Sequence, residues 1–148
     1  MSPAAGAAED PKRQLLAGVR ILDEVMRRHG FEFRFENEGR GSGGRFANGS
    51  YYRDDRRLEL HFRGSLGMVT YWIGESRLMH LDYMRSLGVY GRNRYPDFSD
   101  DALDSFRELG KDIAEFAQDF TGRNGEHFRS FAEQLKKNPA MFSGLATT

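Results

Sequence analysis

RLELHFRGSLGMVTYWI, residues 57–73, is the stretch that decides the fold. In its first half, Leu58, Leu60 and Phe62 alternate with polar residues, which is the period of a strand with one buried and one solvated face. A turn with two glycines precedes residues 68–73, a second and more apolar run. Two such runs around a glycine-bearing turn predict an antiparallel hairpin. We expect its alternating apolar side chains to face the helices, and the polar ones between them to face solvent: Glu59, His61 and Arg63.

Upstream of this hairpin, the sequence predicts one helix and two more strands. Asp10 is a favourable N-cap and Gly30 a favourable C-cap for a helix over residues 11–29, where apolar residues recur every three or four positions. Phenylalanine then alternates with charged residues over 31–36, and a weaker strand pattern covers 45–52. With the hairpin, these strands predict a four-stranded antiparallel meander, because consecutive strands usually pair with each other.

Downstream of the hairpin, the spacing of apolar residues changes to the helical period. It predicts a short helix within residues 75–89, a long helix over about residues 100–120, and a last helix over residues 126–137. The predicted fold class is therefore α+β. An N-terminal helix, a four-stranded antiparallel meander, a short helix and two C-terminal helices follow one another, and the helices pack on one face of the sheet.

Length and composition fit one soluble domain. We expect this domain to cover residues 11–138, between a disordered N-terminal tail at 1–10 and a C-terminal tail at 139–148. The chain has no signal-peptide pattern and no apolar run of the ~20 residues that span a bilayer. We therefore expect a cytoplasmic location without membrane contact. The excess of arginine over lysine, with abundant alanine and glycine, indicates a bacterial source.

The same composition argues against several chemistries. There is no cysteine, and the four histidines lack the HExxH spacing of a metal-binding helix, so we expect no metal and no cofactor. The 22 basic and 22 acidic residues cancel, which leaves no basic footprint for nucleic acid. The glycine-rich segment 39–44 lacks the lysine and hydroxyl residue of a phosphate-binding loop, and it predicts a flexible connection rather than an anion site.

The strongest charge feature is the acidic surface of the predicted helix 100–120. Residues 96–120 contain eight acidic and two basic side chains. Such a surface either keeps the protein soluble or docks a basic partner, because charge complementarity sets partner choice and association rate. In the second interpretation, the partner-binding residues are Asp101, Asp104, Glu108, Asp112 and Glu115.

A pocket between the sheet and the helices is the alternative candidate site. Its expected lining combines aromatic walls with a few polar groups, as in pockets for small ligands. The lining residues are Tyr71, Trp72, His80, Asp82, Tyr83 and Arg85. Such a pocket would serve a small-ligand binder or an enzyme.

The sequence favours a protein-binding module over an enzyme, because a well-formed core accompanies no coherent set of catalytic residues. It predicts a small cytosolic bacterial protein that acts on another protein, as a chaperone, an immunity protein or a regulator does. The uncharged run 68–73 would be an unprotected edge strand, and the apolar stripe of the helix 100–120 is long for so small a domain. We therefore also expect a homodimer through one of these two surfaces.

Overall fold

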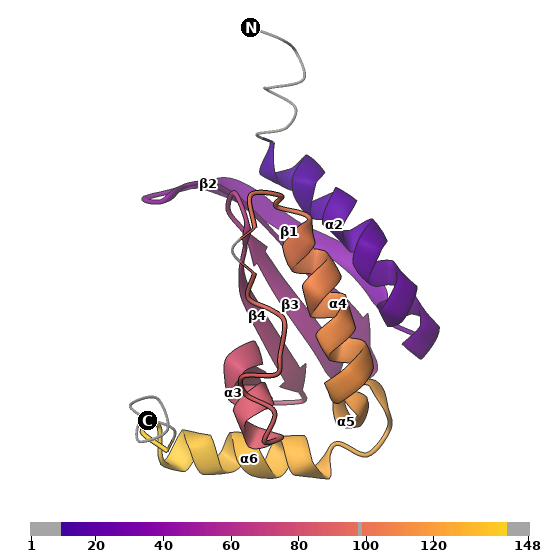
Figure 1. Ribbon diagram of the computed structural model, residues 1–148, viewed down its shortest axis with the longest axis vertical. Helices are drawn as coiled ribbons and strands as arrows, with labels where there is room; N and C mark the ends of the chain where they lie inside the picture. The colour runs from indigo at the N-terminus through magenta and orange to yellow at the C-terminus, as the bar shows by residue number, and fades with distance from the viewer. Residues whose placement is uncertain (1–9, 98, 142–148) are drawn as a thin grey trace, which may run out of the picture.

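A computed structural model describes residues 10–97 and 99–141 as an α+β fold built on one five-stranded antiparallel sheet. The strands lie in chain order, and the helices gather on one face of the sheet (Figure 1). Of the predicted tails, residues 1–9 and 142–148 lie outside the described residues. In the part of the chain that is described, no helix is both long and apolar enough to cross a membrane.

Every strand is antiparallel to its sequence neighbour, which confirms the predicted meander. The strands are β1 (Glu32–Gly41), β2 (Gly44–Arg53), β3 (Arg56–Phe62), β4 (Leu66–Ile73) and β5 (Ser76–Met79). The helices are α2 (Pro11–Met26), the 3-10 helix η1 (Arg27–His29), α3 (His80–Ser86), α4 (Asp104–Phe116), α5 (Gln118–Thr121) and α6 (Glu126–Lys137).

The central hairpin consists of β3 and β4, in the predicted register. Leu58, Leu60 and Phe62 have no exposed surface, and the Phe62 ring stacks on Phe106 of α4 at a centroid distance of 5.9 Å. The alternating polar residues, such as Glu59, are half-buried or exposed on the opposite face. A one-residue slip would exchange the two sets, so this register is fixed by burial.

The sheet has a fifth strand where the sequence predicted only helix. Gly74, at φ +59°, permits a tight turn after β4, and the chain returns as β5 before α3 begins at His80. Leu78 of β5 pairs with Tyr71 of β4, and both are buried against the helices. A strand of four residues is too short to display an alternation, and its one buried leucine also fits the helical spacing that continues into α3.

The glycine-rich segment, which was predicted to be a connection between strands, is instead the paired end of the β1–β2 hairpin. β1 continues to Gly41, and β2 starts at Gly44, which has φ +106°. Ala47 is the first residue of β2 that pairs with β3. The end of the β1–β2 hairpin, where Arg40 pairs with Arg45, therefore projects beyond the third strand (Figure 1). The strand pattern is invisible in the sequence because glycines carry no side chains that could alternate.

The predicted helix 100–120 is shorter and interrupted. It begins at Asp104, because side chains hold the preceding residues in a turn. Asp101 Oδ1 accepts a hydrogen bond from the backbone N–H two residues on at 2.9 Å, and Ser99 Oγ donates to Asp104 Oδ2 at 2.7 Å. Ala117, with ψ 36°, separates α4 from α5. The acidic residues before α4 therefore belong to a turn.

The chain itself covers most of both surfaces that were predicted to support a dimer. The apolar stripe of α4 packs on α2, where a Cβ atom at Gly18 would lie 2.4 Å from the Phe106 ring. Gly110 of α4 also faces α2. β5 pairs with residues 70–73 at the outer edge of β4, so only residues 68–69 of the predicted edge lack a neighbouring strand on that side.

Two arginines tie the sheet to the C-terminal helices. Arg53 donates from Nη1 to the carbonyl of Thr121 and from Nη2 to that of Gly122, both at 2.6 Å. Arg56 donates from Nε to the carbonyl of Phe120 at 3.1 Å. Helix ends leave carbonyl groups without intrahelical partners, and these guanidinium groups supply the missing donors at the end of α5.

Candidate functional site

The face of the sheet opposite the helices carries a row of aromatic and arginine side chains. Strand register places Tyr52, Arg57, Trp72 and Arg77 side by side across β2, β3, β4 and β5. No helix of the described chain covers this side of the sheet (Figure 1). We call this surface the open face and define it by Arg34, Glu36, Tyr52, Arg57, Glu59, His61, Met68, Trp72, Arg77 and Met79.

A β-bulge brings Glu36 into the network at the centre of the open face. The register between β1 and β2 shifts around this residue. Its carboxylate accepts hydrogen bonds from Ser50 Oγ at 2.7 Å, Tyr52 Oη at 2.6 Å and Arg57 Nη2 at 3.2 Å. Burial alone would raise the pKa of Glu36, but these hydrogen bonds and the Arg57 charge outweigh it and lower the pKa. The carboxylate is therefore ionised and held in place at neutral pH.

Arginines and a glutamate fix the two aromatic rings of the open face. The Arg34 guanidinium lies 5.1 Å from the centre of the Tyr52 ring, and the Arg77 guanidinium lies 5.7 Å from that of Trp72. Trp72 Nε1 donates a hydrogen bond to Glu59 Oε1 at 3.1 Å. Because both rings already have fixed neighbours, little side-chain freedom remains to be lost when something docks on them.

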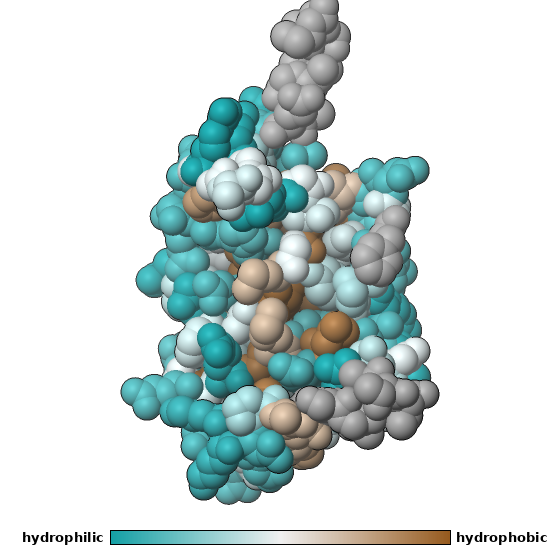
Figure 2. Space-filling view, turned by 90° about the vertical axis from the view of Figure 1, so that its left-hand side faces the viewer, coloured by the Kyte–Doolittle hydropathy of each residue, from teal (hydrophilic) through white to brown (hydrophobic). Residues whose placement is uncertain are grey.

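The open face ends in an apolar patch beside a cavity. Met68 is 49% and Met79 42% exposed at the β4–β5 edge. They line a cavity of about 280 Å³ together with Val69, Tyr95 and Pro96. Figure 2, which looks onto this side of the molecule, shows apolar side chains gathered at its centre between polar margins. Methionine packs adaptably, so this patch suits contact with an apolar side chain of a partner.

A chain of buried polar groups lies behind the cavity. The Tyr71 hydroxyl is 2.8 Å from His80 Nδ1, and His80 Nε2 is 3.0 Å from Asp112 Oδ2. The Asp112 carboxylate also accepts the backbone N–H groups of Arg94 and Tyr95 at 2.8–2.9 Å. Burial, followed by the Asp112 charge, raises the pKa of Tyr71 well above its usual value, so this tyrosine stays protonated.

This network leaves His80 without a nitrogen for chemistry. Asp112 Oδ2 accepts the backbone N–H groups of Arg94 and Tyr95, so His80 Nε2 is the donor in the bond between the two side chains. The Tyr71 hydroxyl, which stays protonated, donates to His80 Nδ1. The histidine is 3% exposed and both ring nitrogens are engaged inside the protein. The arrangement joins β4, α3 and α4 and serves the fold.

The predicted pocket is only partly assembled. Three of its six residues line the cavity: His80, Asp82 and Arg85. Tyr71 and Tyr83 are fully buried in the core, whereas Trp72 lies on the open face. Successive residues of a strand point to opposite faces, which separates Tyr71 from Trp72.

The five residues of the predicted acidic partner surface do not lie on one common surface. Asp112 is completely buried, and it does not lie on the solvated side of the helix as predicted. The other four residues each form an ion pair with a nearby basic side chain: Asp101, Asp104, Glu108 and Glu115. The burial of Asp112 could have been predicted from the sequence. This residue lies three positions after Leu109 and directly before Ile113, and both of these belong to the buried stripe of α4.

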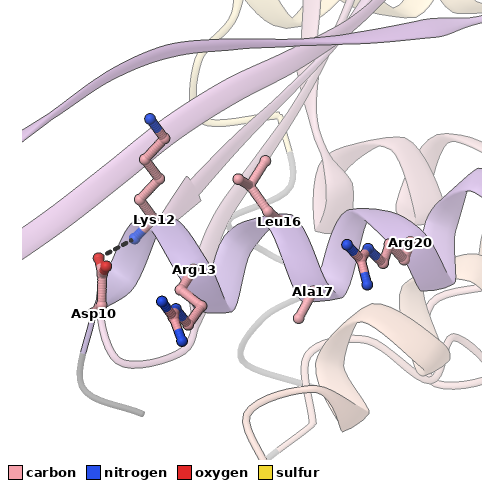
Figure 3. A pocket seen from close by; sticks show the side chains of 6 residues that line it. All are labelled: Asp10, Lys12, Arg13, Leu16, Ala17 and Arg20. Atoms are coloured by element: carbon pink, nitrogen blue, oxygen red, sulfur yellow. Dashed lines mark hydrogen bonds between the residues drawn. The ribbon is translucent and has the colours of Figure 1, made fainter. Parts of the chain in front are cut away.

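A hollow of about 430 Å³ along α2 does not form a converging site. Its lining residues are Asp10, Lys12, Arg13, Leu16, Ala17 and Arg20. Figure 3 shows their side chains spreading to different sides of the helix. The one bond between them joins the backbone N–H of Lys12 to Asp10 Oδ1 at 3.1 Å and caps the helix.

Neither a metal site nor a similarity to known proteins indicates the function of this chain. Among residues 10–97 and 99–141, no group of three or more histidine, cysteine, aspartate or glutamate side chains could hold a metal ion. A scan against protein-family models, a search of curated proteins and a search of solved structures each found no match. The open face is therefore the basis for a proposed function.

We expect Glu36→Gln to destabilise the protein at neutral pH by about 1–2 kcal/mol, the value of a few hydrogen bonds to a charged group. The pKa of Glu36 is lowered from its ordinary value of 4.5 in the folded state, so its contribution to stability is complete above that value. It is lost as the pH falls through the lowered folded pKa. Urea unfolding of both proteins at neutral pH and at about pH 3 measures the difference.

The exposed Glu38, two positions further along β1, provides the control, because no change in stability is expected for Glu38→Gln. An equal loss for Glu36→Gln at both pH values would show that the charge of Glu36 is not what stabilises the fold.

Proposed function

We propose that the protein is a small protein-binding module that docks its open face on a protein partner, as a chaperone, an immunity protein or a regulator does. The observation that carries the proposal is the concentration of aromatic, arginine and methionine side chains on a sheet face that no described helix covers. These residue types are enriched in protein interfaces, and tryptophan, tyrosine and arginine dominate their energetic hot spots.

The fixed geometry of this face supports the same proposal. Glu36 anchors Tyr52 and Arg57, and Glu59 anchors Trp72. A surface whose side chains are already ordered loses less entropy on association.

The charge pattern of the open face indicates which charges the surface of a partner must carry. Arg34, Arg57 and Arg77 alternate with Glu36 and Glu59 across the strands, so neither sign predominates. A partner therefore needs a mixed pattern of opposite charges, which gives specificity rather than broad attraction. The apolar patch at the β4–β5 edge would receive an apolar side chain from that partner.

A small-ligand binder or enzyme is the second candidate, and the cavity beside the patch is the observation in its favour. Its volume of about 280 Å³ lies just below the ~300–1,000 Å³ of ordinary ligand sites. His80, the one histidine in its lining, has both nitrogens engaged. Protein binding therefore accounts for more of the geometry. Cytoplasmic location and bacterial origin stay predictions.

Photo-crosslinking in the host cell tests the proposed function. A benzophenone side chain is placed at Arg77, which is exposed on the open face, or at Glu133, which is exposed on α6. We expect a discrete covalent adduct with one protein from position 77 and none from position 133. The double variant Arg77→Glu, Met68→Lys, probed from position 79, should lose the adduct, because removing hot-spot residues costs about 2 kcal/mol or more each.

Both substituted residues are exposed, so an unchanged unfolding transition is expected for this variant. Equal adducts from both crosslinking positions, or an adduct that survives the double variant, would rule out the open face as the binding surface. A second copy of the chain is one possible occupant. In that case light scattering should give about twice the 16.9 kDa of the monomer, and the double variant should restore the monomer mass.

A further inference from the structure

A second cluster of arginines, none of which belongs to the open face, surrounds a polar cavity of about 660 Å³. The cavity lies where η1, the β2–β3 turn and the end of α5 meet. Its lining contains four arginines and one carboxylate: Arg28, Arg53, Arg56, Arg123 and Asp54. Segments far apart in the sequence thus place arginine side chains around the same cavity.

The Arg53 guanidinium is fixed in this cavity by hydrogen bonds, and among the described residues it forms no ion pair. Its guanidinium donates to the carbonyls of His29 at 2.7 Å and of Thr121 and Gly122 at 2.6 Å, and it stacks on the Phe31 ring at 4.7 Å. Carbonyl groups carry no net charge. These bonds use three of the five N–H donors of the arginine, and the other two have no hydrogen-bond partner among the described residues.

The neighbouring arginines add to this unbalanced charge. Arg56 has an ion pair with Asp55 at 2.8 Å, but Arg28 and Arg123 are exposed and, within the described residues, form no ion pair. Burial lowers the pKa of Arg53, and the charges of Arg56 and Arg123 lower it further, although Asp54 opposes them. The arginines therefore repel one another, and an anion between them would relieve this repulsion.

We infer that this cavity is a binding site for a small polyvalent anion of the phosphate class, held between Arg28 and Arg123 over the fixed guanidinium of Arg53. Arginine presents a planar fork of donors that matches the oxygens of phosphate in pairs. Two arginines with free ends can close on the ligand, while the third is already positioned. The site is independent of the protein-binding proposal.

Calorimetric titration of the full chain with pyrophosphate at low ionic strength tests the site. We expect saturable binding in the low-millimolar range or tighter, with each of Arg28→Gln and Arg123→Gln weakening it about tenfold or more, as expected for lost hydrogen bonds to a charged group. Arg40→Gln, at an exposed arginine on the β1–β2 hairpin, is the matched control and should leave affinity unchanged. Amide resonances of His29, Gly122 and Arg123 should shift on titration.

Three results would overturn the inference. The first is an absence of saturable binding. The second is binding that is weakened by Arg40→Gln but not by the cavity variants, or that shifts resonances elsewhere. The third is equal affinity for citrate, because it would show a site for any polyvalent anion and remove the assignment to phosphate. Unchanged unfolding transitions of the variants, expected because both arginines are exposed, keep these results interpretable.

Discussion

Asp112→Ala is expected to lower the free energy of unfolding by about 3–5 kcal/mol, the cost of removing one member of a buried charged network. The Asp112 carboxylate has no exposed surface and accepts hydrogen bonds from His80 Nε2 and from the backbone N–H groups of Arg94 and Tyr95. Alanine would leave these donors without partners in the interior, where each costs about 1–3 kcal/mol. Urea unfolding at neutral pH measures the loss.

Glu115→Ala is the matched control for this prediction. Glu115 lies one turn along the same helix and pairs with Arg94 at 2.8 Å, but its side chain is 43% exposed. An exposed ion pair contributes about 1 kcal/mol or less. Asp112→Asn should be intermediate, because the amide keeps the shape and one acceptor but turns an NH₂ group toward other donors. If Asp112→Ala and Glu115→Ala cost the same, the buried network contributes no more than a surface pair.

Those parts of the fold that rest on long periodic patterns were predictable from the sequence. Alternation in β3 gave the register of the central hairpin, and Asp10 and Gly30 gave the ends of the first helical segment, where Gly30 has φ +86°. β5 was not predictable, since its four residues contain too little pattern. The glycine-rich hairpin was missed for a related reason, because its pairing depends on the backbone alone.

The candidate site was less predictable than the fold, because it depends on contacts between distant residues. Strict alternation would have placed Trp72 opposite Tyr71, but both faces of β4 are apolar and the pattern is masked. The bulge that turns Glu36 toward Tyr52 has no signal in the residues around it. The pairing of His80 with an acid from α4 likewise requires knowledge of how the helices pack.

These misses share a physical cause. A helix or hairpin pattern reports which face of an element is buried, but not which residue of another element it meets. Polar groups on buried faces are therefore the hardest to interpret. They need partners from elsewhere in the chain, and the sequence shows only that the partner must exist.

Phe120→Ala is expected to have an effect as large as that of Asp112→Ala, about 3–5 kcal/mol, because it deletes a fully buried aromatic ring. The Phe120 ring stacks on Phe31 at 5.4 Å, meets Tyr71 edge-on at 5.0 Å and lies 6.2 Å from Phe128. These rings come from four different parts of the chain, so the cavity left by alanine cannot close by moving one element. Phe131→Ala, at a half-buried position on α6, should cost clearly less. Denaturant unfolding of the two variants decides between them. A loss of less than about 1 kcal/mol for Phe120→Ala would mean that the core repacks around the gap, and that α5 is held to the sheet by the arginine bonds to its carbonyls rather than by its aromatic side chain.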